Sequence, residues 1–249
     1  MSYRIAAAIL MCLPVSIRAQ GNPPAAKAVA PIDLTGYWVS IVTEDWRFRM
    51  VTPAKGDYAS VPLNAEGRKI ADAWDPAKDE AAGAQCKSYG APAIMRVPGR
   101  LHVTWTDDNT LRIDTDSGTQ TRLFHFGASK VPAGDVSLQG LSVASWEGLV
   151  AGRGGAPAPI VGGQARGYLK VVTSQMRPGY LRKNGVPYSA STKLTEFYDR
   201  TAEPNGDQWL VVQTIVEDPV YLVQPFITST HFKKIADASG WSPSACAAQ

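Results

Sequence analysis

The feature that most constrains this chain is an alternation of apolar and polar residues, broken at intervals by turn residues. In the segment 100–105 every second side chain is apolar, from Leu101 to Trp105. Successive side chains of an extended strand point to opposite faces, so this alternation is typical of a strand with one buried face. Asp107 to Asn109 then supply turn residues, and the alternation resumes. The pattern predicts an antiparallel meander of three strands over residues 100–105, 111–113 and 121–126.

The same pattern recurs on both sides of this meander. Further strands are predicted over residues 36–43, 167–174, 192–200, 209–217 and 226–235, with a hairpin turn at 205–207. One helix is predicted from Ala65 to Trp74, with Asn64 as its N-cap and Asp75-Pro76 as its stop. About eight or nine strands with one short helix indicate an all-β fold. We expect a closed antiparallel barrel, with a sandwich as the alternative, because closure removes exposed strand edges.

The N-terminal end has the pattern of a secretory signal peptide. A basic residue, Arg4, precedes an apolar run from Ile5 to Val15, and Ala19 offers a small residue before a cleavage site. The run is too short for a transmembrane helix. A lipoprotein is the alternative, but the residues before Cys12 lack the small side chains of a lipidation site. We therefore expect a signal peptide over 1–19, a disordered mature N-terminus over 20–31 and a single barrel domain over 32–249, secreted or periplasmic.

Cleavage would leave two cysteines, Cys86 and Cys246. Disulfides persist in exported proteins, and neither cysteine lies in a segment typical of a core. We therefore expect a Cys86–Cys246 disulfide that ties the C-terminal tail to the body of the domain. The formal charge of +3 falls to about +1 once Arg4 and Arg18 are removed, and no basic cluster predicts binding to nucleic acid or to anionic lipid.

The segment 151–166 differs from the rest of the chain, because it holds five glycines and two prolines in sixteen residues. Its Arg153-Gly154-Gly155 has the composition of a phosphate-binding loop, but no strand-to-helix context surrounds it. We interpret the segment as a flexible surface loop that could cover a barrel mouth.

The sequence Gly36-Tyr37-Trp38 resembles the Gly-x-Trp opening of lipocalin and wider calycin barrels. In those barrels the tryptophan closes one end against an arginine or lysine of a late strand. The resemblance implies a calycin-like or lipocalin-like barrel, with Lys233 or Lys234 as the partner of Trp38.

From Leu63 to Phe232 the chain also resembles a poorly characterised group of secreted bacterial β-barrel proteins. That resemblance implies fold and export, and no activity. The shared features are, in order, Leu63, Glu66-Gly67, Asp75-Pro76, Cys86, Trp146-Glu147-Gly148, Glu196, Asp218-Pro219 and Pro225-Phe226.

This chain departs from the group at two positions where its relatives tend to carry a His-Ser pair. Leu141-Ser142 stands at the first position and Tyr188-Ser189 at the second. This chain also inserts the segment 151–166 after Trp146-Glu147-Gly148, where the relatives continue directly into a strand. If those histidines do chemistry in the group, this protein has lost that chemistry or performs a different one.

Three histidines, each on a different predicted strand, are His102, His125 and His231. Inward histidines from neighbouring strands could form a three-coordinate metal site, although no His-x-His spacing supports it. Ordinary structural or surface histidines are the alternative, and we expect no metal and no organic cofactor. His125 is also a candidate catalytic acid or base.

Two carboxylates of the shared pattern, Glu147 and Glu196, are the candidate catalytic acids. A nucleophilic serine motif of the Gly-x-Ser-x-Gly type is absent from the sequence. The alternative role is structural, in which a buried glutamate pairs with Arg96, Arg112 or Arg122.

Aromatic residues are numerous, with seven tryptophans and nine tyrosines. In Trp46-Arg47-Phe48-Arg49 aromatic and basic residues alternate, so an extended segment would have one apolar face and one basic face. Core packing is one interpretation, and an aromatic pocket with an arginine is the other. The candidate ligand-binding residues are Trp38, Trp46, Arg47, Tyr58, Arg122, Trp146 and Tyr198.

We therefore expect a secreted or periplasmic binding protein that holds a small apolar or aromatic ligand in its barrel. The alternative is a cofactor-independent lyase, isomerase or hydrolase that uses carboxylate and histidine acid-base chemistry. The expected partner is a small molecule; neither nucleic acid nor a membrane span in the mature protein is expected.

Overall fold

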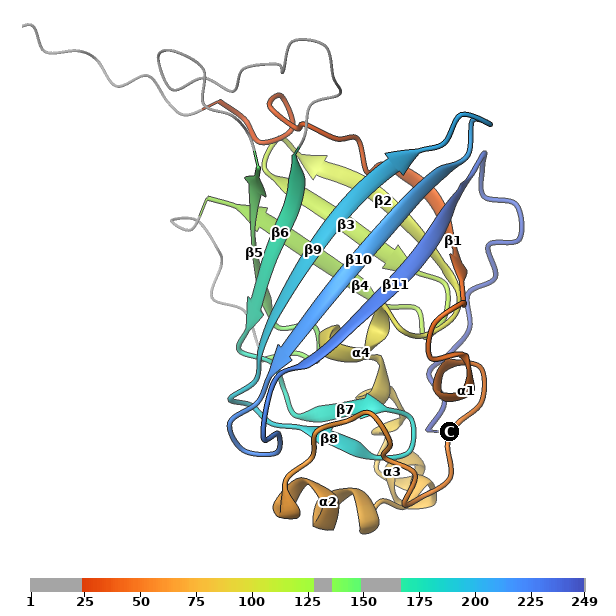
Figure 1. Ribbon diagram of the computed structural model, residues 1–249, viewed down its shortest axis with the longest axis vertical. Coiled ribbons are helices and arrows are strands. Elements are labelled where there is room, and N and C mark those ends of the chain that lie inside the picture. The colour runs from red at the N-terminus through yellow and green to blue at the C-terminus, as the bar shows by residue number, and fades with distance from the viewer. Residues whose placement is uncertain (1–23, 128–135, 149–166, 249) are drawn as a thin grey trace, which may run out of the picture.

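Nine strands close into a barrel in the computed structural model, which describes residues 24–127, 136–148 and 167–248 (Figure 1). Neighbours around the barrel follow the order β1-β11-β10-β9-β6-β5-β4-β3-β2. The strands are β1 (Gly36–Ile41), β2 (Arg100–Asp107), β3 (Thr110–Thr115), β4 (Thr121–Phe126), β5 (Leu141–Glu147), β6 (Tyr168–Ser174), β9 (Lys193–Ala202), β10 (Gln208–Glu217) and β11 (Phe226–Ile235). The predicted all-β barrel is therefore confirmed.

Pairing within the barrel is antiparallel with one exception. β4 pairs with β5 in parallel, with Phe124 opposite Ser142. β1 pairs with both β11 and β2, so the first and last strands close the barrel. The meander of β2, β3 and β4 is confirmed, whereas β5 was not expected from the sequence.

Short helices and a hairpin lie beneath one end of the barrel, and we call this group the base (Figure 1). The predicted helix is present as α2, and the Asn64 side chain accepts a hydrogen bond from the Gly67 amide as an N-cap. Asp75 follows α2 and caps the next helix, which begins at Pro76. The base consists of α1 (Trp46–Arg49), α2 (Ala65–Asp72), α3 (Pro76–Ala81), the 3-10 helix η1 (Gln85–Tyr89), α4 (Ala91–Ile94), β7 (Gly179–Arg182) and β8 (Val186–Tyr188).

Two apolar clusters stabilise the molecule. The upper cluster fills the barrel and includes Trp38, Phe124 and Phe232, and Ile94 of α4 packs into it from below. The lower cluster joins the end of the barrel to the base, where Phe226 of β11 belongs to the same cluster as residues of α2, β7 and β8. Burial of these side chains is the main favourable contribution to folding.

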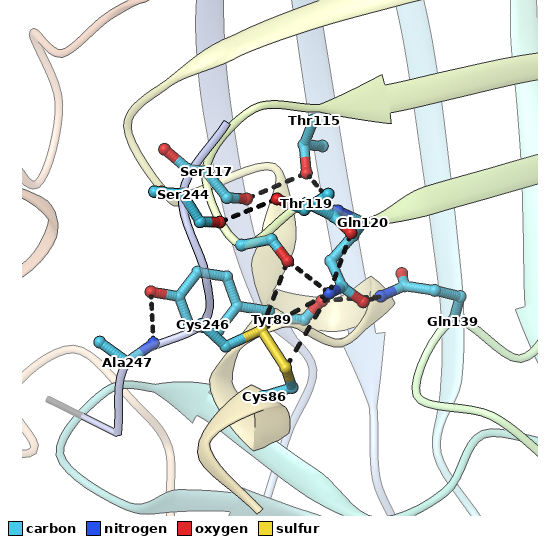
Figure 2. Close-up of a disulfide and its surroundings, with 11 residues drawn as sticks. Cys86, Tyr89, Thr115, Ser117, Thr119, Gln120, Gln139, Ser244, Cys246 and Ala247 are labelled. Carbon is cyan, nitrogen blue, oxygen red and sulfur yellow. Dashed lines mark hydrogen bonds between the residues drawn. A yellow bond between two sulfur atoms is a disulfide. The ribbon is translucent and has the colours of Figure 1, made fainter. Parts of the chain in front are cut away.

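The predicted disulfide between Cys86 and Cys246 is confirmed, with the two Cα atoms 5.0 Å apart (Figure 2). Cys86 lies in η1 and Cys246 in the C-terminal tail. The tail also receives a hydrogen bond from Thr119, whose hydroxyl donates to the Ser244 carbonyl. The disulfide therefore fastens the tail to the base and to the turn between β3 and β4.

Residues 24–31 lie against the barrel, which corrects the expectation of disorder for this part of 20–31. The Ala26 amide donates to Asn109 Oδ1 at 2.9 Å, and Trp146 Nε1 donates to the Ala26 carbonyl at 2.8 Å. These side-chain partners hold the Ala26 backbone in place despite the Ala/Pro-rich composition of the segment. The predicted signal peptide over 1–19 and the loop 151–166 lie outside the described residues. Where the chain is described, no helix combines the length and apolarity needed to cross a membrane.

Candidate functional site

A ring of polar side chains crosses the barrel interior between the two apolar clusters, and we call it the polar layer. It takes one residue from each of six adjacent strands, β4, β5, β6, β9, β10 and β11. Each of these residues is at most 9% exposed. The members are Arg122, Ser142, Thr173, Glu196, Thr214 and Thr228.

Strand alternation places these residues at one level. On β9, Leu194 of the lower cluster, Glu196 and Tyr198 of the upper cluster follow at every second position, so all three point inward. On the neighbouring strands, Thr214 pairs with Glu196 and also with Thr228. Residues paired in this way have side chains on the same face of the sheet. The layer therefore follows from the register of the strands.

Arg122 and Glu196 form the centre of the layer as a fully buried ion pair. Arg122 Nη1 donates to Glu196 Oε1 at 2.9 Å, and Nη2 donates to Oε2 at 2.6 Å. Both side chains have no solvent exposure. This bidentate geometry is the strong form of a charge-assisted hydrogen bond. Burial alone lowers the pKa of the Arg122 guanidinium, but the Glu196 carboxylate and Tyr198 raise it overall, so the cation persists.

Tyr198 and Thr173 complete the contacts of this pair. The Tyr198 hydroxyl donates to Glu196 Oε1 at 3.1 Å, and Arg122 Nη2 lies 3.4 Å from Thr173 Oγ1. Burial and the Glu196 charge raise the pKa of Tyr198 well above its ordinary value, so its phenol stays protonated. Thr173 in turn shares a 2.8 Å hydrogen bond with Ser142.

Three buried atoms of the layer have no hydrogen-bond partner among the described residues: Arg122 Nε, Thr214 Oγ1 and Thr228 Oγ1. Leaving a buried polar group unsatisfied costs about 1–3 kcal/mol, so native proteins rarely retain several together. The layer therefore has free hydrogen-bonding capacity at one donor of Arg122 and at the two threonine hydroxyls.

Three aromatic rings pack against the upper cluster, near the N-terminal segment 24–31. Trp146 lies 5.3 Å from Phe126 and 6.5 Å from Trp105, measured between ring centroids. The three rings are only partly buried and pack against the upper cluster. They form an aromatic surface next to Ala26, to which Trp146 is hydrogen-bonded.

Trp38 is fully buried on β1, and its Nε1 donates to the Leu34 carbonyl at 2.9 Å. Of the two expected lysine partners, Lys234 is the one in contact, with Nζ 5.4 Å from the Trp38 ring centroid. Trp38 therefore lies inside the barrel as part of the upper cluster, and its ligand-binding role stays a prediction.

Three predicted site residues, Arg122, Glu196 and Tyr198, are brought together by the structure. Two others do not join them, because strand parity points them outward. Glu147 lies near Lys170, with its carboxylate 3.9 Å from that ammonium, on the outside of β5. His125 alternates with the inward Phe124 on β4 and faces out.

Three further predicted ligand-binding residues lie in or beside the base and not in the barrel interior. Trp46 is 63% exposed, and Arg47 pairs with Asp57. Tyr58 is buried, with its hydroxyl donating to Asp72 Oδ1 at 2.8 Å. The predicted apolar and basic faces also fail, because residues 46–49 form the helix α1, in which alternating residues do not share a face.

The three histidines do not converge, which overturns the tri-histidine metal site. They lie on β2, β4 and β11, and each pair of these strands is separated by at least one other strand. His102 stacks on Tyr37 with ring centroids 4.0 Å apart, whereas His231 pairs with Glu44. Within the described residues, no group of three His, Cys, Asp or Glu side chains could hold a metal ion.

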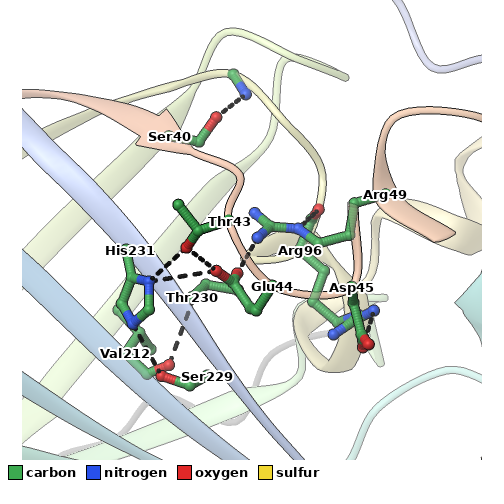
Figure 3. Close-up of polar contacts among 11 residues, drawn as sticks. Ser40, Thr43, Glu44, Asp45, Arg49, Arg96, Val212, Ser229, Thr230 and His231 are labelled. Atoms are coloured by element: carbon green, nitrogen blue, oxygen red, sulfur yellow. Dashed lines mark hydrogen bonds and ion pairs between the residues drawn. The ribbon is translucent and has the colours of Figure 1, made fainter. Parts of the chain in front are cut away.

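A serine, a histidine and a carboxylate line up on the outside of the barrel, where the sequence analysis expected no site (Figure 3). Ser229 Oγ lies 3.4 Å from His231 Nε2, and His231 Nδ1 lies 3.2 Å from the Glu44 carboxylate. Ser229 also lines an open groove of about 440 Å³. The signal in the sequence is the two-residue spacing of Ser229 and His231, which places both on one face of a strand.

Comparisons with known proteins found no family model, no curated protein and no solved structure that this chain matches. The chemistry of the polar layer therefore carries the functional proposal.

Proposed function

We propose that this protein binds a small, largely apolar or aromatic molecule inside the barrel, with the polar end of that molecule at the polar layer. The single observation that supports this proposal is the group of three unpartnered buried atoms on Arg122, Thr214 and Thr228. Each of these atoms is buried without a hydrogen-bond partner among the described residues, and apolar clusters lie on both sides of the layer.

The chemistry of the layer defines the ligand. Arg122 Nε is a donor only, while each threonine hydroxyl both donates and accepts. A carbonyl, phenol or carboxylate would satisfy these groups. Above and below the layer the contacts are apolar, so the rest of the ligand is apolar or aromatic.

Binding is favoured over catalysis by Glu196. Both oxygens of its carboxylate already accept hydrogen bonds from Arg122, and Oε1 accepts a third from Tyr198. A carboxylate has about four lone-pair sites, so protein donors already occupy most of those of Glu196. Glu196 therefore holds Arg122 in position for a ligand. The disulfide is compatible with a secreted or periplasmic location, because such bonds persist in oxidising compartments.

Native mass spectrometry of protein purified without denaturation tests this function. We expect an added mass of a small organic molecule that is lost on unfolding. In the double variant Thr214→Val and Thr228→Val the added mass should be strongly reduced, because the hydroxyls are removed while the side-chain shape is kept. Thr201→Val, an exposed substitution on β9, is the matched control and should retain the ligand. A bare chain mass for the wild type, or equal retention by the double variant, contradicts the proposal.

The alternative function, a cofactor-independent hydrolase, is favoured by one observation, the Ser229–His231–Glu44 alignment. In such a site the histidine takes the serine proton as the hydroxyl attacks an ester carbonyl, and the carboxylate orients the imidazole. A fluorophosphonate probe tests it, because such probes label activated serines. Labelling that Ser229→Ala and His231→Ala both abolish would support hydrolysis, and absence of labelling would leave ligand binding as the function.

A further inference from the structure

Three buried arginines converge between the base and the lower end of the barrel. Arg49 ends α1, Arg96 follows α4, and Arg182 ends β7. Their residues are 8%, 6% and 3% exposed. A cavity of about 30 Å³ lies among them, and Phe48, Ser88 and Lys183 also line it. We call this feature the arginine pocket.

Two of the three cations have a carboxylate partner (Figure 3). Arg49 pairs with Glu44, and Arg96 Nη2 lies 3.0 Å from Asp45 Oδ2. For Arg182, no carboxylate of the described residues lies within 4.0 Å. Within the described residues its side chain makes one hydrogen bond, from Nη1 to the Ala59 carbonyl at 2.7 Å. Of the three buried arginines, Arg182 is therefore the one without a carboxylate partner among the described residues.

Four nitrogen atoms of the pocket have no acceptor in the described part of the chain. They are Arg49 Nη2, Arg96 Nη1, Arg182 Nε and Arg182 Nη2. Buried guanidinium groups are ordinarily paired, since an unpaired buried charge is strongly unfavourable. The Arg182 guanidinium also stacks on Phe48, with Cζ 4.1 Å from the ring centroid, which fixes the direction of its free N–H groups.

The electrostatics of Arg182 agree with a missing counter-charge. Burial lowers the pKa of its guanidinium to about 10, and the neighbouring Arg96 cation contributes to the lowering. Asp45 and Asp57 act in the opposite direction but are too distant to pair with it. Lys183 adds a further positive charge at the cavity wall. An anion in the pocket would remove this imbalance.

We propose that the arginine pocket binds a small oxyanion, a phosphate, sulfate or carboxylate group, with Arg182 as its principal ligand and Arg49 and Arg96 as supporting donors. Guanidinium groups present planar pairs of N–H donors that match the oxygen pairs of such groups. The cavity exceeds the roughly 10–15 Å³ that one water molecule requires, so it admits an anionic group of a few atoms. The site is separate from the polar layer, and its occupancy does not depend on the proposed ligand-binding function.

Thermal unfolding of the mature protein in sodium phosphate, sodium sulfate and sodium acetate, each against sodium chloride at equal ionic strength, tests the site. A ligand that binds only the folded state raises the melting temperature with its concentration. We expect a saturable rise with at least one oxyanion, and the ranking among the three separates phosphate and sulfate from carboxylate. Arg182→Met should weaken the apparent affinity by about tenfold or more, because charged hydrogen bonds contribute roughly 1.5–3 kcal/mol each.

Two further variants make the result specific. Arg112→Met removes the same charge from a partly exposed arginine on the outside of β3 and should leave the oxyanion response unchanged. Arg182→Lys keeps the charge but loses the planar pair of donors, so it should also weaken binding, and it serves if Arg182→Met does not fold. Equal responses of the wild type, Arg182→Met and Arg182→Lys would overturn the proposal, as would a response to oxyanions no larger than that to chloride.

Discussion

Glu196 neutralises the Arg122 cation in a part of the barrel that has no solvent exposure. Removing one partner of a buried ion pair leaves an uncompensated charge and costs about 3–5 kcal/mol. We therefore expect Glu196→Gln to lower the free energy of unfolding by about that amount. Glu147→Gln makes the same chemical change on the outside of β5 and should cost less than about 1 kcal/mol. Urea unfolding of both variants measures the difference, and similar losses would contradict the role of the pair.

The residue types in the sequence predicted part of the polar layer. Glu196 and Arg122 were candidates, and an ion pair between a buried glutamate and one of three arginines was among the alternatives. Their partnership depends on β4 and β9 facing each other across the barrel, which no local pattern encodes. Glu147 and His125 lie apart from this pair, because successive side chains of a strand point to opposite faces and both residues face outward.

At the scale of an element, the contacts of Gly67 in α2 affect stability more than its low helix propensity does. Alanine in a helix is ordinarily favoured over glycine by about 1 kcal/mol. Here a Cβ atom at Gly67 would lie 2.8 Å from both Leu63 Cδ2 and the Tyr221 carbonyl oxygen. We expect Gly67→Ala to destabilise the protein by about 1–3 kcal/mol, measured by urea unfolding. Arg68→Ala on the exposed side of α2 should change stability by less than about 0.5 kcal/mol; a stabilising Gly67→Ala would refute the close packing of α2.

Elements with regular alternation were predictable, and β4 and β11 have the predicted bounds. β5 was missed because its inward positions include Ser142 and Ala144, which are too polar or too small to mark a buried face. The helix α1 was missed because its four residues alternate like a strand, although Arg49 is buried and Trp46 is exposed. In both cases tertiary contacts decide the structure of a short segment.

For the whole molecule, the Cys86–Cys246 disulfide joins segments that are 160 residues apart in the chain. A cross-link over a long loop restricts the unfolded chain, and removing such a bond costs about 2–5 kcal/mol. We expect the variant Cys86→Ser with Cys246→Ser to lose that amount in urea unfolding. Reductant should lower the stability of the wild type to the same level and leave the variant unaffected. An unchanged unfolding midpoint would contradict a stabilising role for the bond.

The sequence predicted the fold class, a closed β-barrel, because many alternating strands would otherwise leave exposed sheet edges. The parallel pairing of β4 with β5 and the base beneath the barrel depend on contacts between distant segments. The same contacts create both proposed sites, since neither the polar layer nor the arginine pocket draws its residues from one segment.

The main proposal is that a ligand binds at the polar layer. A crystal structure of natively purified protein is the most direct test of that proposal. We predict electron density of a small organic molecule within hydrogen-bond distance, about 3 Å, of Arg122 Nε, Thr214 Oγ1 and Thr228 Oγ1. The body of that molecule should contact the apolar side chains of the upper or lower cluster. Density for water molecules alone at these three atoms, or a layer closed by protein side chains, would contradict the account.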